Sequence, residues 1–247
     1  MSTSFRSKKI LGQYFLTNTD ILKKIAAAAE IRHGDLVIEI GPGTGTLTDE
    51  LLKTGAYIIA IEKDRELAVL LCAKYKNTKN IEIIENDILK FDPSFVIRHS
   101  SFVIVGNIPY YLTSRLLRII LTQWPPPKLI VLMVQKEVAQ RIIARSPHMN
   151  MLALLVQLHG TPEIVRIVKR GSFSPPPKVD SAILKIAVKL YSSTAVKLLQ
   201  LAARGFAHPR KMLGSNLPKD KLIKAGIDPA RRPGTLTVDE WRRISMV

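Results

Sequence analysis

The chain has 247 residues, 47% of them hydrophobic, with a mean hydropathy of +0.12. That is enough for one well-buried α/β domain with a small appendage, and it excludes a disordered chain. No apolar run reaches the ~20 residues of a membrane-spanning helix, and the first residues lack the apolar stretch of a secretory signal. The single cysteine, Cys72, excludes an intramolecular disulfide. We therefore expect a cytoplasmic protein.

Charge is the most informative part of the composition. Lys and Arg number 37 against 20 Asp and Glu, a net charge of +17. Residues 37–93 hold ten acids and seven bases, whereas residues 191–247 hold eleven bases and four acids. Such a basic excess favours a polyanionic partner, because phosphate attraction and counterion release stabilise the complex. An anionic membrane is the competing partner, but no basic amphipathic helix with bulky aromatics is present, so we expect nucleic acid and no membrane. The five histidines are scattered without zinc-binding spacing, so no metal is expected.

Predicted helices and strands alternate along the chain. The first helix spans residues 18–29, with Asn18 as its cap. Strands are predicted at 36–40, 57–61, 81–84, 102–105 and 129–134, and helices at 47–53, 64–75, 114–123 and 136–144. Segment 171–178 is a rigid extended connection, and a strand at 182–188 completes the sheet. This pattern predicts a Rossmann-like, doubly wound α/β fold over residues 1–189. Beyond residue 190 the pattern is helical and basic, which predicts a small domain at 190–247.

The first candidate site feature follows the first strand of this sheet. Ligands of open α/β sheets bind at the carboxyl ends of the strands. Glycines at 41, 43 and 45 let backbone approach a ligand closely, and their spacing is G-x-G-x-G. It is not the G-x-G-x-x-G of pyrophosphate sites, so it suits a compact nucleoside with an amino-acid tail. A generic strand-to-helix turn is the alternative.

Carboxylates end the next two strands. Glu62 ends the second strand and is placed to accept both hydroxyls of a ribose. A surface ion pair with Lys63 or Arg65 is the alternative. Asn86 and Asp87 end the third strand, where a carboxylate accepts a hydrogen bond from an adenine amino group. Asn-Asp after a strand is also ordinary turn chemistry.

The fourth strand ends in the most informative motif, Gly106-Asn107-Ile108-Pro109-Tyr110. An aromatic amine is a poor nucleophile because its lone pair is delocalised into the ring. An amide oxygen of Asn107 and a backbone carbonyl near Pro109 would accept its two N–H bonds and free the lone pair to attack a sulfonium methyl. Tyr110 offers a face on which the target base stacks. A proline turn beside a core tyrosine is the alternative.

These motifs closely resemble those of the KsgA/Dim-type ribosomal RNA adenine dimethyltransferases, and more distantly those of the Erm resistance enzymes. The resemblance is carried by the following segments, which span nearly the whole chain: Leu11-Gly-Gln-Tyr-Phe-Leu16, Glu39 to Thr48, Glu62, Asn86-Asp87, Gly106 to Tyr111, Gln135 to Ala139, Phe173 to Ser181 and Phe206 to Leu217. The Pro-Gly-Thr-Gly loop and the segment Pro175 to Ser181 favour the KsgA type over the Erm type.

The resemblance implies S-adenosylmethionine as methyl donor and a role for each matching residue. Gln13, Tyr14 and Leu16 would close over the methionine end of the donor, although the family commonly has Asn or His where Tyr14 stands. Gly41 and Gly43 would lie against the donor, Glu62 would hold its ribose and Asp87 its adenine. Asn107 would lie between the donor and the target base, and Phe173 would stack on that base opposite Tyr110. Apart from the resemblance, the charge pattern favours RNA binding by the basic residues Lys8, Lys9, Arg204, Arg210 and Lys211.

The expected function is dimethylation of two adjacent adenosines near the 3′ end of small-subunit ribosomal RNA during ribosome assembly, by a monomer. Three alternatives stay open from the sequence. An Erm-type enzyme would modify large-subunit RNA. An assembly factor would depend more on RNA binding than on catalysis. A small-molecule N-methyltransferase would leave the charge of +17 unexplained.

Overall fold

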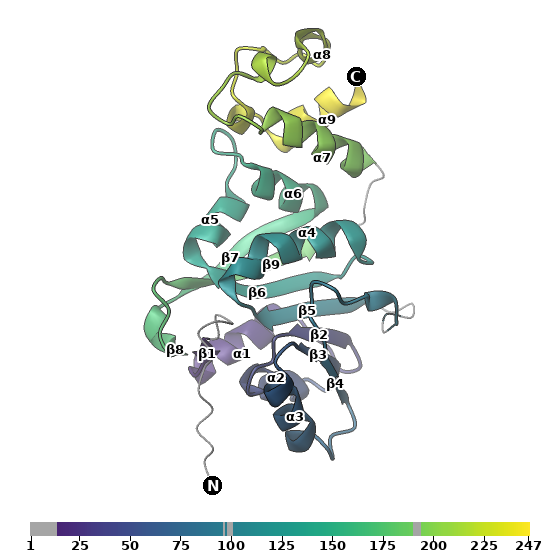
Figure 1. Ribbon diagram of the computed structural model, residues 1–247, viewed down its shortest axis with the longest axis vertical. Coiled ribbons are helices and arrows are strands. Elements are labelled where there is room, and N and C mark those ends of the chain that lie inside the picture. Colours follow the sequence, from purple (N-terminus) through teal and green to yellow (C-terminus); the bar gives the residue numbers. More distant parts are fainter. Residues whose placement is uncertain (1–13, 96, 98–100, 190–193) are drawn as a thin grey trace. The chain divides into compact units, whose positions relative to one another are not determined.

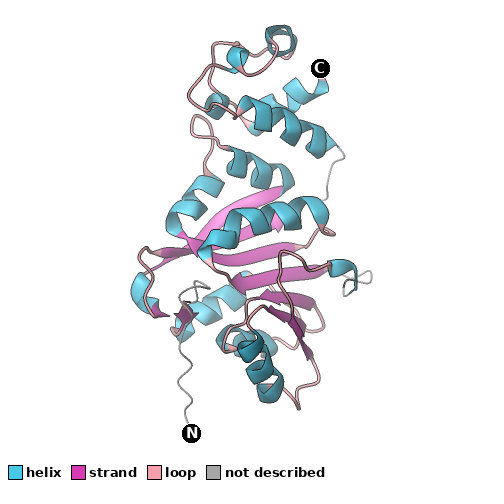
Figure 2. Cartoon of the chain, viewed as in Figure 1, coloured by secondary structure: helices cyan, strands magenta, loops and turns pink. Residues whose placement is uncertain are grey.

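A computed structural model describes residues 14–95, 97, 101–189 and 194–247 (Figures 1 and 2). The described chain forms two compact units. The first holds the described residues up to Lys136 together with Glu163–Val188, and the second holds Glu137–Pro162 and the described part of Lys189–Val247. The domain boundary predicted at residue 190 stays a prediction, and α5 and α6 (Lys136–Ile143 and Met151–His159) contribute mainly to the second unit. None of the described helices is long and apolar enough to cross a membrane.

A seven-stranded sheet has the order β4-β3-β2-β5-β6-β9-β7. The strands are β2 (Leu36–Ile40), β3 (Tyr57–Glu62), β4 (Ile81–Glu85), β5 (Phe102–Asn107), β6 (Leu129–Gln135), β7 (Gly160–Val168) and β9 (Ser181–Val188). Neighbours from β4 to β6 are parallel, and β9 runs antiparallel to β6. The strand order changes direction at β2, with β3 and β4 on one side of it and β5 and β6 on the other. Sheets of this kind bind ligands at such a switch point. The predicted α/β class is confirmed, but the sheet is not purely parallel.

The helices of the first unit follow from capping and apolar spacing. They are α1 (Thr19–Ala28), α2 (Thr46–Leu52), α3 (Arg65–Lys74) and α4 (Thr113–Gln123). Asn18 caps α1 by accepting hydrogen bonds from the N–H groups of Asp20 and Ile21, as its sequence position predicts. Ile21 and Ile25 are buried, in one core cluster with Val37 and Val131 of the sheet. These contacts fix the strand ends that carry the site.

A two-stranded antiparallel ribbon lies beside the main sheet of the first unit. It pairs β1 (Phe15–Leu16) with β8 (Phe173–Ser174), so that Leu16 stands opposite Phe173. The N–H of Thr17 extends the ribbon by donating to the carbonyl of Ser172 at 3.1 Å. Leu16 and Phe173 are both buried in the core cluster of this unit. The ribbon therefore joins the start of the described chain to a segment more than 150 residues later.

The second unit is helical and has its own core. Its further helices are α7 (Thr194–Gly205), α8 (Lys219–Lys224) and α9 (Val238–Met246). Trp241 is fully buried, and its ring stacks on Phe206 at 5.2 Å between centroids. Thr237 and Glu240 form a capping box at the start of α9, and Glu240 also pairs with Arg231. The predicted helical character of the chain beyond residue 190 is confirmed for the described residues.

Candidate active site

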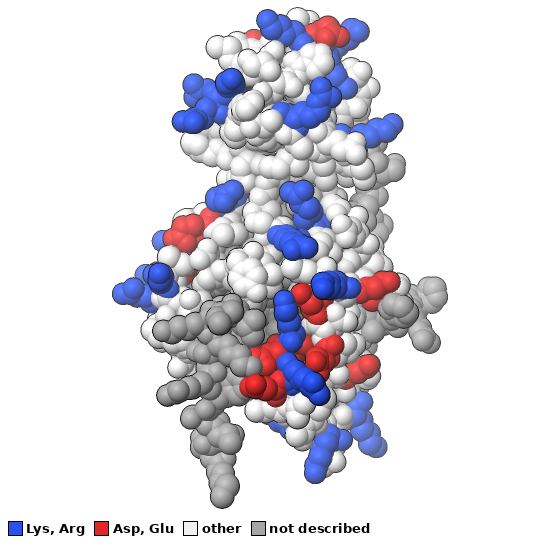
Figure 3. Space-filling view, in the orientation of Figure 1, with Lys and Arg blue, Asp and Glu red and all other residues white. Residues whose placement is uncertain are grey.

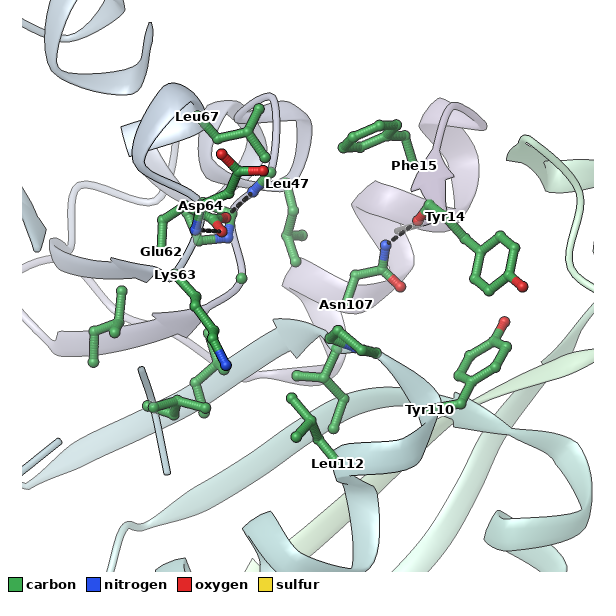
Figure 4. A pocket seen from close by; sticks show the side chains of 18 of the residues that line it. Tyr14, Phe15, Leu47, Glu62, Lys63, Asp64, Leu67, Asn107, Tyr110 and Leu112 are labelled. Atoms are coloured by element: carbon green, nitrogen blue, oxygen red, sulfur yellow. Dashed lines mark hydrogen bonds between the residues drawn. The ribbon is translucent and has the colours of Figure 1, made fainter. Parts of the chain in front are cut away.

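A cavity of about 320 Å³ opens at the carboxyl ends of β2, β3, β4 and β5. This volume lies in the range of small-molecule sites. Figure 4 shows two differently built sides. Glu62 and Lys63 lie on one side, and Tyr14, Asn107 and Tyr110 lie on the other. The cavity therefore has one charged end and one aromatic end, both built from the first unit.

The glycine loop brings backbone to the cavity wall. Gly43 has a φ of +61°, which side-chain-bearing residues rarely adopt. A Cβ at this position would also lie 3.2 Å from a ring carbon of Phe15. The N–H of Gly43 donates to Oε2 of Glu62 at 3.0 Å. A side chain at position 43 would therefore strain the backbone and crowd the ring of Phe15, so glycine suits this close approach of loop, ring and carboxylate.

Glu62 is a buried carboxylate at the end of β3, with 6% of its surface exposed. Its second oxygen accepts a hydrogen bond from the N–H of Asp64 at 2.9 Å. Burial raises the pKa of Glu62, and the backbone N–H donors oppose that rise. The surface ion pair with Lys63 that the sequence left open does not form, because Lys63 pairs with Asp87. Each Glu62 oxygen retains acceptor capacity for a ligand hydroxyl.

Asp87 also lines the cavity, two residues beyond the end of β4. Its Oδ2 accepts from Nζ of Lys63 at 2.9 Å, and its Oδ1 accepts from the N–H of Leu89 at 3.0 Å. Burial acts to raise the pKa of Asp87, but these two donors outweigh it and hold the pKa below its usual value. The bond to Leu89 is the turn chemistry anticipated from the sequence. Asp87 can therefore form this turn and still offer an ionised hydrogen-bond acceptor to the cavity.

Asn107 ends β5 with its amide held in one orientation. Its Nδ2 donates to the main-chain carbonyl of Tyr14 at 3.0 Å. A carbonyl only accepts hydrogen bonds, so the amide nitrogen must face Tyr14 and Oδ1 must face the other way. The structure gives Oδ1 no donor among the described residues, and Asn107 lines the cavity. The result is a fixed, available acceptor.

Tyr110 is anchored at its hydroxyl and half-buried along its ring. The hydroxyl forms a 2.6 Å hydrogen bond with Oγ of Ser181. The ring lies against that of Tyr14, with centroids 5.6 Å apart and planes inclined by 25°. Burial raises the pKa of Tyr110, so the hydroxyl stays neutral near pH 7. Tyr110 lines the cavity, which distinguishes it from a tyrosine wholly packed in the core.

Most of the predicted site residues meet at this cavity. Those that line it are Tyr14, Leu16, Gly41, Gly43, Glu62, Asp87, Asn107, Pro109 and Tyr110. Phe173 does not: its ring is 4% exposed and packs in the core. Its stacking role stays a prediction, and that role requires the ring to become accessible. Gln13, Lys8 and Lys9 lie outside the described residues.

Three residues of the site were not predicted in their observed roles. They are Lys63, which pairs with Asp87, Phe15, which lies over Gly43, and Ser181, which anchors Tyr110. Phe15 and Ser181 each sit inside a segment that carries the family resemblance, Leu11 to Leu16 and Phe173 to Ser181, whereas Lys63 does not. The partners of Lys63 and Ser181 are 24 and 71 residues away in sequence, and no local pattern specifies such a contact.

Glu39 is a buried acid on β2 beneath the glycine loop. It has no exposed surface, and its Oε2 accepts from the hydroxyl of Thr48 at 2.7 Å. Its Oε1 has no hydrogen-bond partner among the described residues. Burial raises the pKa of Glu39 to about 8. Glu39 is therefore neutral at pH 7 and adds no charge beside Glu62.

Comparison with known proteins decides the family. Residues 4–245 match the family described as ribosomal RNA adenine dimethylase. The chain belongs to this family. It is 40% identical to the ribosomal RNA small subunit methyltransferase A of Dehalococcoides mccartyi, over 99% of this chain and 89% of that protein. Its counterpart in Clostridium acetobutylicum is 36% identical, over 98% of this chain and 94% of that protein.

Two solved structures share the fold of this family member. A dimethyladenosine transferase from Plasmodium falciparum is 29% identical, with a TM-score of 0.80 over 93% of this chain and 95% of that one. The 23S rRNA methyltransferase ErmE is 26% identical, with a TM-score of 0.76 over 94% and 98%. The predicted enzyme class, a ribosomal RNA adenine dimethyltransferase, is confirmed at the level of the family. Membership implies S-adenosylmethionine as methyl donor.

Proposed function

We propose that the chain dimethylates adenine in small-subunit ribosomal RNA, at two adjacent adenosines near the 3′ end. The observation that carries this proposal is the fixed amide of Asn107, whose Oδ1 faces away from Tyr14 at the aromatic end of the cavity. The names of the D. mccartyi and C. acetobutylicum relatives support the small subunit as target. Assembling small subunits in the cytoplasm are the partner, and the enzyme acts as a monomer without a metal.

The charged end of the cavity fits the nucleoside part of S-adenosylmethionine. Glu62 would accept hydrogen bonds from the ribose hydroxyls, because each of its oxygens has spare acceptor capacity. Asp87 would accept a hydrogen bond from the amino group of the adenine. Gly41 and Gly43 would let the loop lie directly against the donor, and Leu16 together with the main chain of Tyr14 would line its methionine end. When bound, the donor supplies an electrophilic methyl carbon on a sulfonium.

The aromatic end would hold and activate the target base. Asn107 Oδ1 and a backbone carbonyl near Pro109 would accept the two N–H bonds of the adenine amine. These bonds draw the nitrogen toward tetrahedral geometry, so that its lone pair leaves the ring and attacks the methyl carbon. Methyl transfer would leave sulfur with the electron pair of its broken bond to carbon, and the methylated amine would release a proton to water. Preorganised acceptors of this kind need no rearrangement during the reaction.

The helical unit would supply contacts to RNA phosphates. Arg204, Arg210 and Lys211 are exposed, and none of them forms an ion pair with a described acid. On the face shown in Figure 3, Lys and Arg predominate over the α7–α9 region, whereas acids gather over the part of the sheet unit around α2. Glu240 and Asp239 are already paired with Arg231 and Arg242. Phosphate contacts position RNA without reading its sequence.

The Erm-type alternative rests on the structural likeness to ErmE, at 26% identity. The curated relatives at 36–40% identity are named for the small subunit, which favours that target. A protein that only binds RNA during assembly would not need the fixed orientation of Asn107. An enzyme that acts on a small molecule would not need the exposed arginines.

Methyl transfer to purified subunits tests the proposal. Unmethylated small and large ribosomal subunits are each incubated with the enzyme and S-adenosylmethionine carrying a labelled methyl group, and the modified nucleotide is mapped. We expect label in dimethyladenosine of the small subunit alone. Label in the large subunit would assign the Erm-type target. Label in neither, with binding intact, would favour the assembly role.

A further inference from the structure

Tyr14 touches the site in two separate ways. Its main-chain carbonyl accepts the 3.0 Å hydrogen bond that orients Asn107. Its ring lies against Tyr110, with centroids 5.6 Å apart. Figure 4 shows the ring directed toward Tyr110 and away from the carboxylates at the other end. The main chain and the side chain of Tyr14 therefore contact different parts of the site.

The ring of Tyr14 packs partly against the core cluster of the first unit, but it is not enclosed there. It is half-buried and lines the cavity, and the structure gives its hydroxyl no hydrogen bond among the described residues. The neighbouring Tyr110 differs, because Ser181 holds its hydroxyl. A buried tyrosine hydroxyl usually finds a partner, so an aromatic ring with a free polar tip at a cavity wall is suited to contact with a ligand.

The separation of the two rings limits how a base meets them. A base placed between two aromatic rings needs them roughly 7 Å apart, twice the van der Waals distance between carbons. The two centroids are only 5.6 Å apart, and the planes are 25° from parallel. No base fits between Tyr14 and Tyr110. A base in the cavity therefore meets the pair from outside, as a single aromatic surface.

We propose that the side chain of Tyr14 binds the target adenine, as an extension of the Tyr110 stacking surface, rather than the methyl donor. This proposal rests on the proposed function and deepens it. The main chain and the side chain of Tyr14 then have different roles: the carbonyl positions Asn107, and the ring enlarges the surface that captures the base. The ribbon holds the segment in place, because Tyr14 directly precedes β1.

The test separates substrate capture from donor binding. Tyr14→Ala keeps the carbonyl that orients Asn107 and removes the ring. KM and kcat are measured on unmethylated small subunits at saturating S-adenosylmethionine, and donor affinity is measured by calorimetry. We expect KM for the subunit to rise at least about fivefold, the lower range of one base-stacking contact. The kcat and the donor Kd should stay within about twofold. Tyr14→Phe should restore KM.

A matched control and three outcomes make the test decisive. Tyr57→Ala removes an exposed tyrosine that does not line the cavity and should change neither KM nor donor Kd. An unchanged KM for Tyr14→Ala overturns the proposal. A lower KM would mean that the ring blocks the base, and a weaker donor Kd with KM unchanged would assign the ring to the donor; either result also overturns it. If the wild type labels only the large subunit, the proposed target fails, and the same comparison on that substrate still decides the role of Tyr14.

Discussion

The side-chain nitrogen of Asn107 donates a hydrogen bond to the main-chain carbonyl of Tyr14, 93 residues earlier in the chain. This contact fixes which end of the amide faces the cavity. Because the partner is a main-chain group, substitution of the Tyr14 side chain leaves it in place. The orientation of the proposed catalytic amide is thus protected from substitution of the side chain at position 14.

Asn107→Ala should abolish the proposed activation of the amine. We expect kcat to fall about 100- to 1000-fold, the cost typical of removing one preorganised electrostatic contact. Affinity for S-adenosylmethionine and for the small subunit should change little, because Asn107 acts on one amine. Single-turnover methylation, with both affinities measured in parallel, checks this. Near-normal turnover would remove Asn107 from the mechanism.

Glu62→Ala and Asp87→Ala should each weaken binding of S-adenosylmethionine. Loss of a charged hydrogen-bond acceptor costs about 1.5–3 kcal/mol, or roughly tenfold to a hundredfold in affinity. Isothermal calorimetry measures the effect. Glu82→Ala is the matched control, since it removes the same charge from an exposed position on β4 that does not line the cavity. Equal affinities in all three variants would place the nucleoside elsewhere.

Glu39→Gln should change how stability depends on pH. In the folded chain burial raises the pKa of Glu39 from 4.5 to about 8. Between these two values the unfolded chain ionises Glu39 and the folded chain does not, so stability of the wild type falls as pH rises. Each pH unit in this window costs up to about 1.4 kcal/mol. Gln keeps an acceptor for Thr48 and does not titrate.

Denaturant unfolding at pH 5 and pH 8 measures this difference. The free energy of unfolding of Glu39→Gln should rise relative to the wild type by up to a few kcal/mol between the two pH values. Glu137→Gln removes an exposed carboxylate and should follow the wild type at both. A constant gap between Glu39→Gln and wild type would show that Glu39 is ionised in the fold.

Neutralising Arg210 and Lys211 together should weaken binding to the ribosomal subunit. The salt dependence of log K should flatten by roughly 0.7–0.9 for each RNA phosphate that the variant no longer neutralises. S-adenosylmethionine affinity should not change. The double variant Lys76→Ala, Lys79→Ala removes the same charge from exposed positions beyond α3. If both double variants bind alike across salt concentrations, Arg210 and Lys211 do not bind phosphate.

The strands β2 to β6 and the helices α1 to α4 of the first unit were predictable because each has a strong local pattern. Asn18 and Asp64 cap α1 and α3 as their positions suggest, and β2, β3 and β5 are near-continuous apolar runs. By contrast β7 was not predicted. It follows α6 directly, contains Pro162, and exposes much of its surface, so neither a turn nor clear alternation marks it. The local sequence of β9 does not indicate that the strand runs antiparallel to β6, because its direction depends on how the preceding chain returns to the sheet.

The site was predictable where it lies on strand ends and not where it depends on pairing across the fold. Glu62, Asp87 and Asn107 each follow an apolar strand, and parallel strands bring those ends to one edge. The ion pair of Lys63 with Asp87 joins two such ends, and only the register of β3 and β4 brings it about. The burial of Phe173 likewise follows from its pairing with Leu16.

The ribbon of β1 and β8 joins the segment that follows Tyr14 to the segment that holds Phe173. Leu16, on the strand that follows Tyr14, shares its backbone pairing with Phe173. If Phe173 stacks on a base as proposed, its ring must leave a core that it shares with Leu16, a residue that also lines the cavity. We therefore expect occupancy of the proposed donor pocket and exposure of Phe173 to be energetically linked. Such linkage is reciprocal: if the bound donor raises the affinity for RNA by some factor, bound RNA raises the affinity for the donor by the same factor.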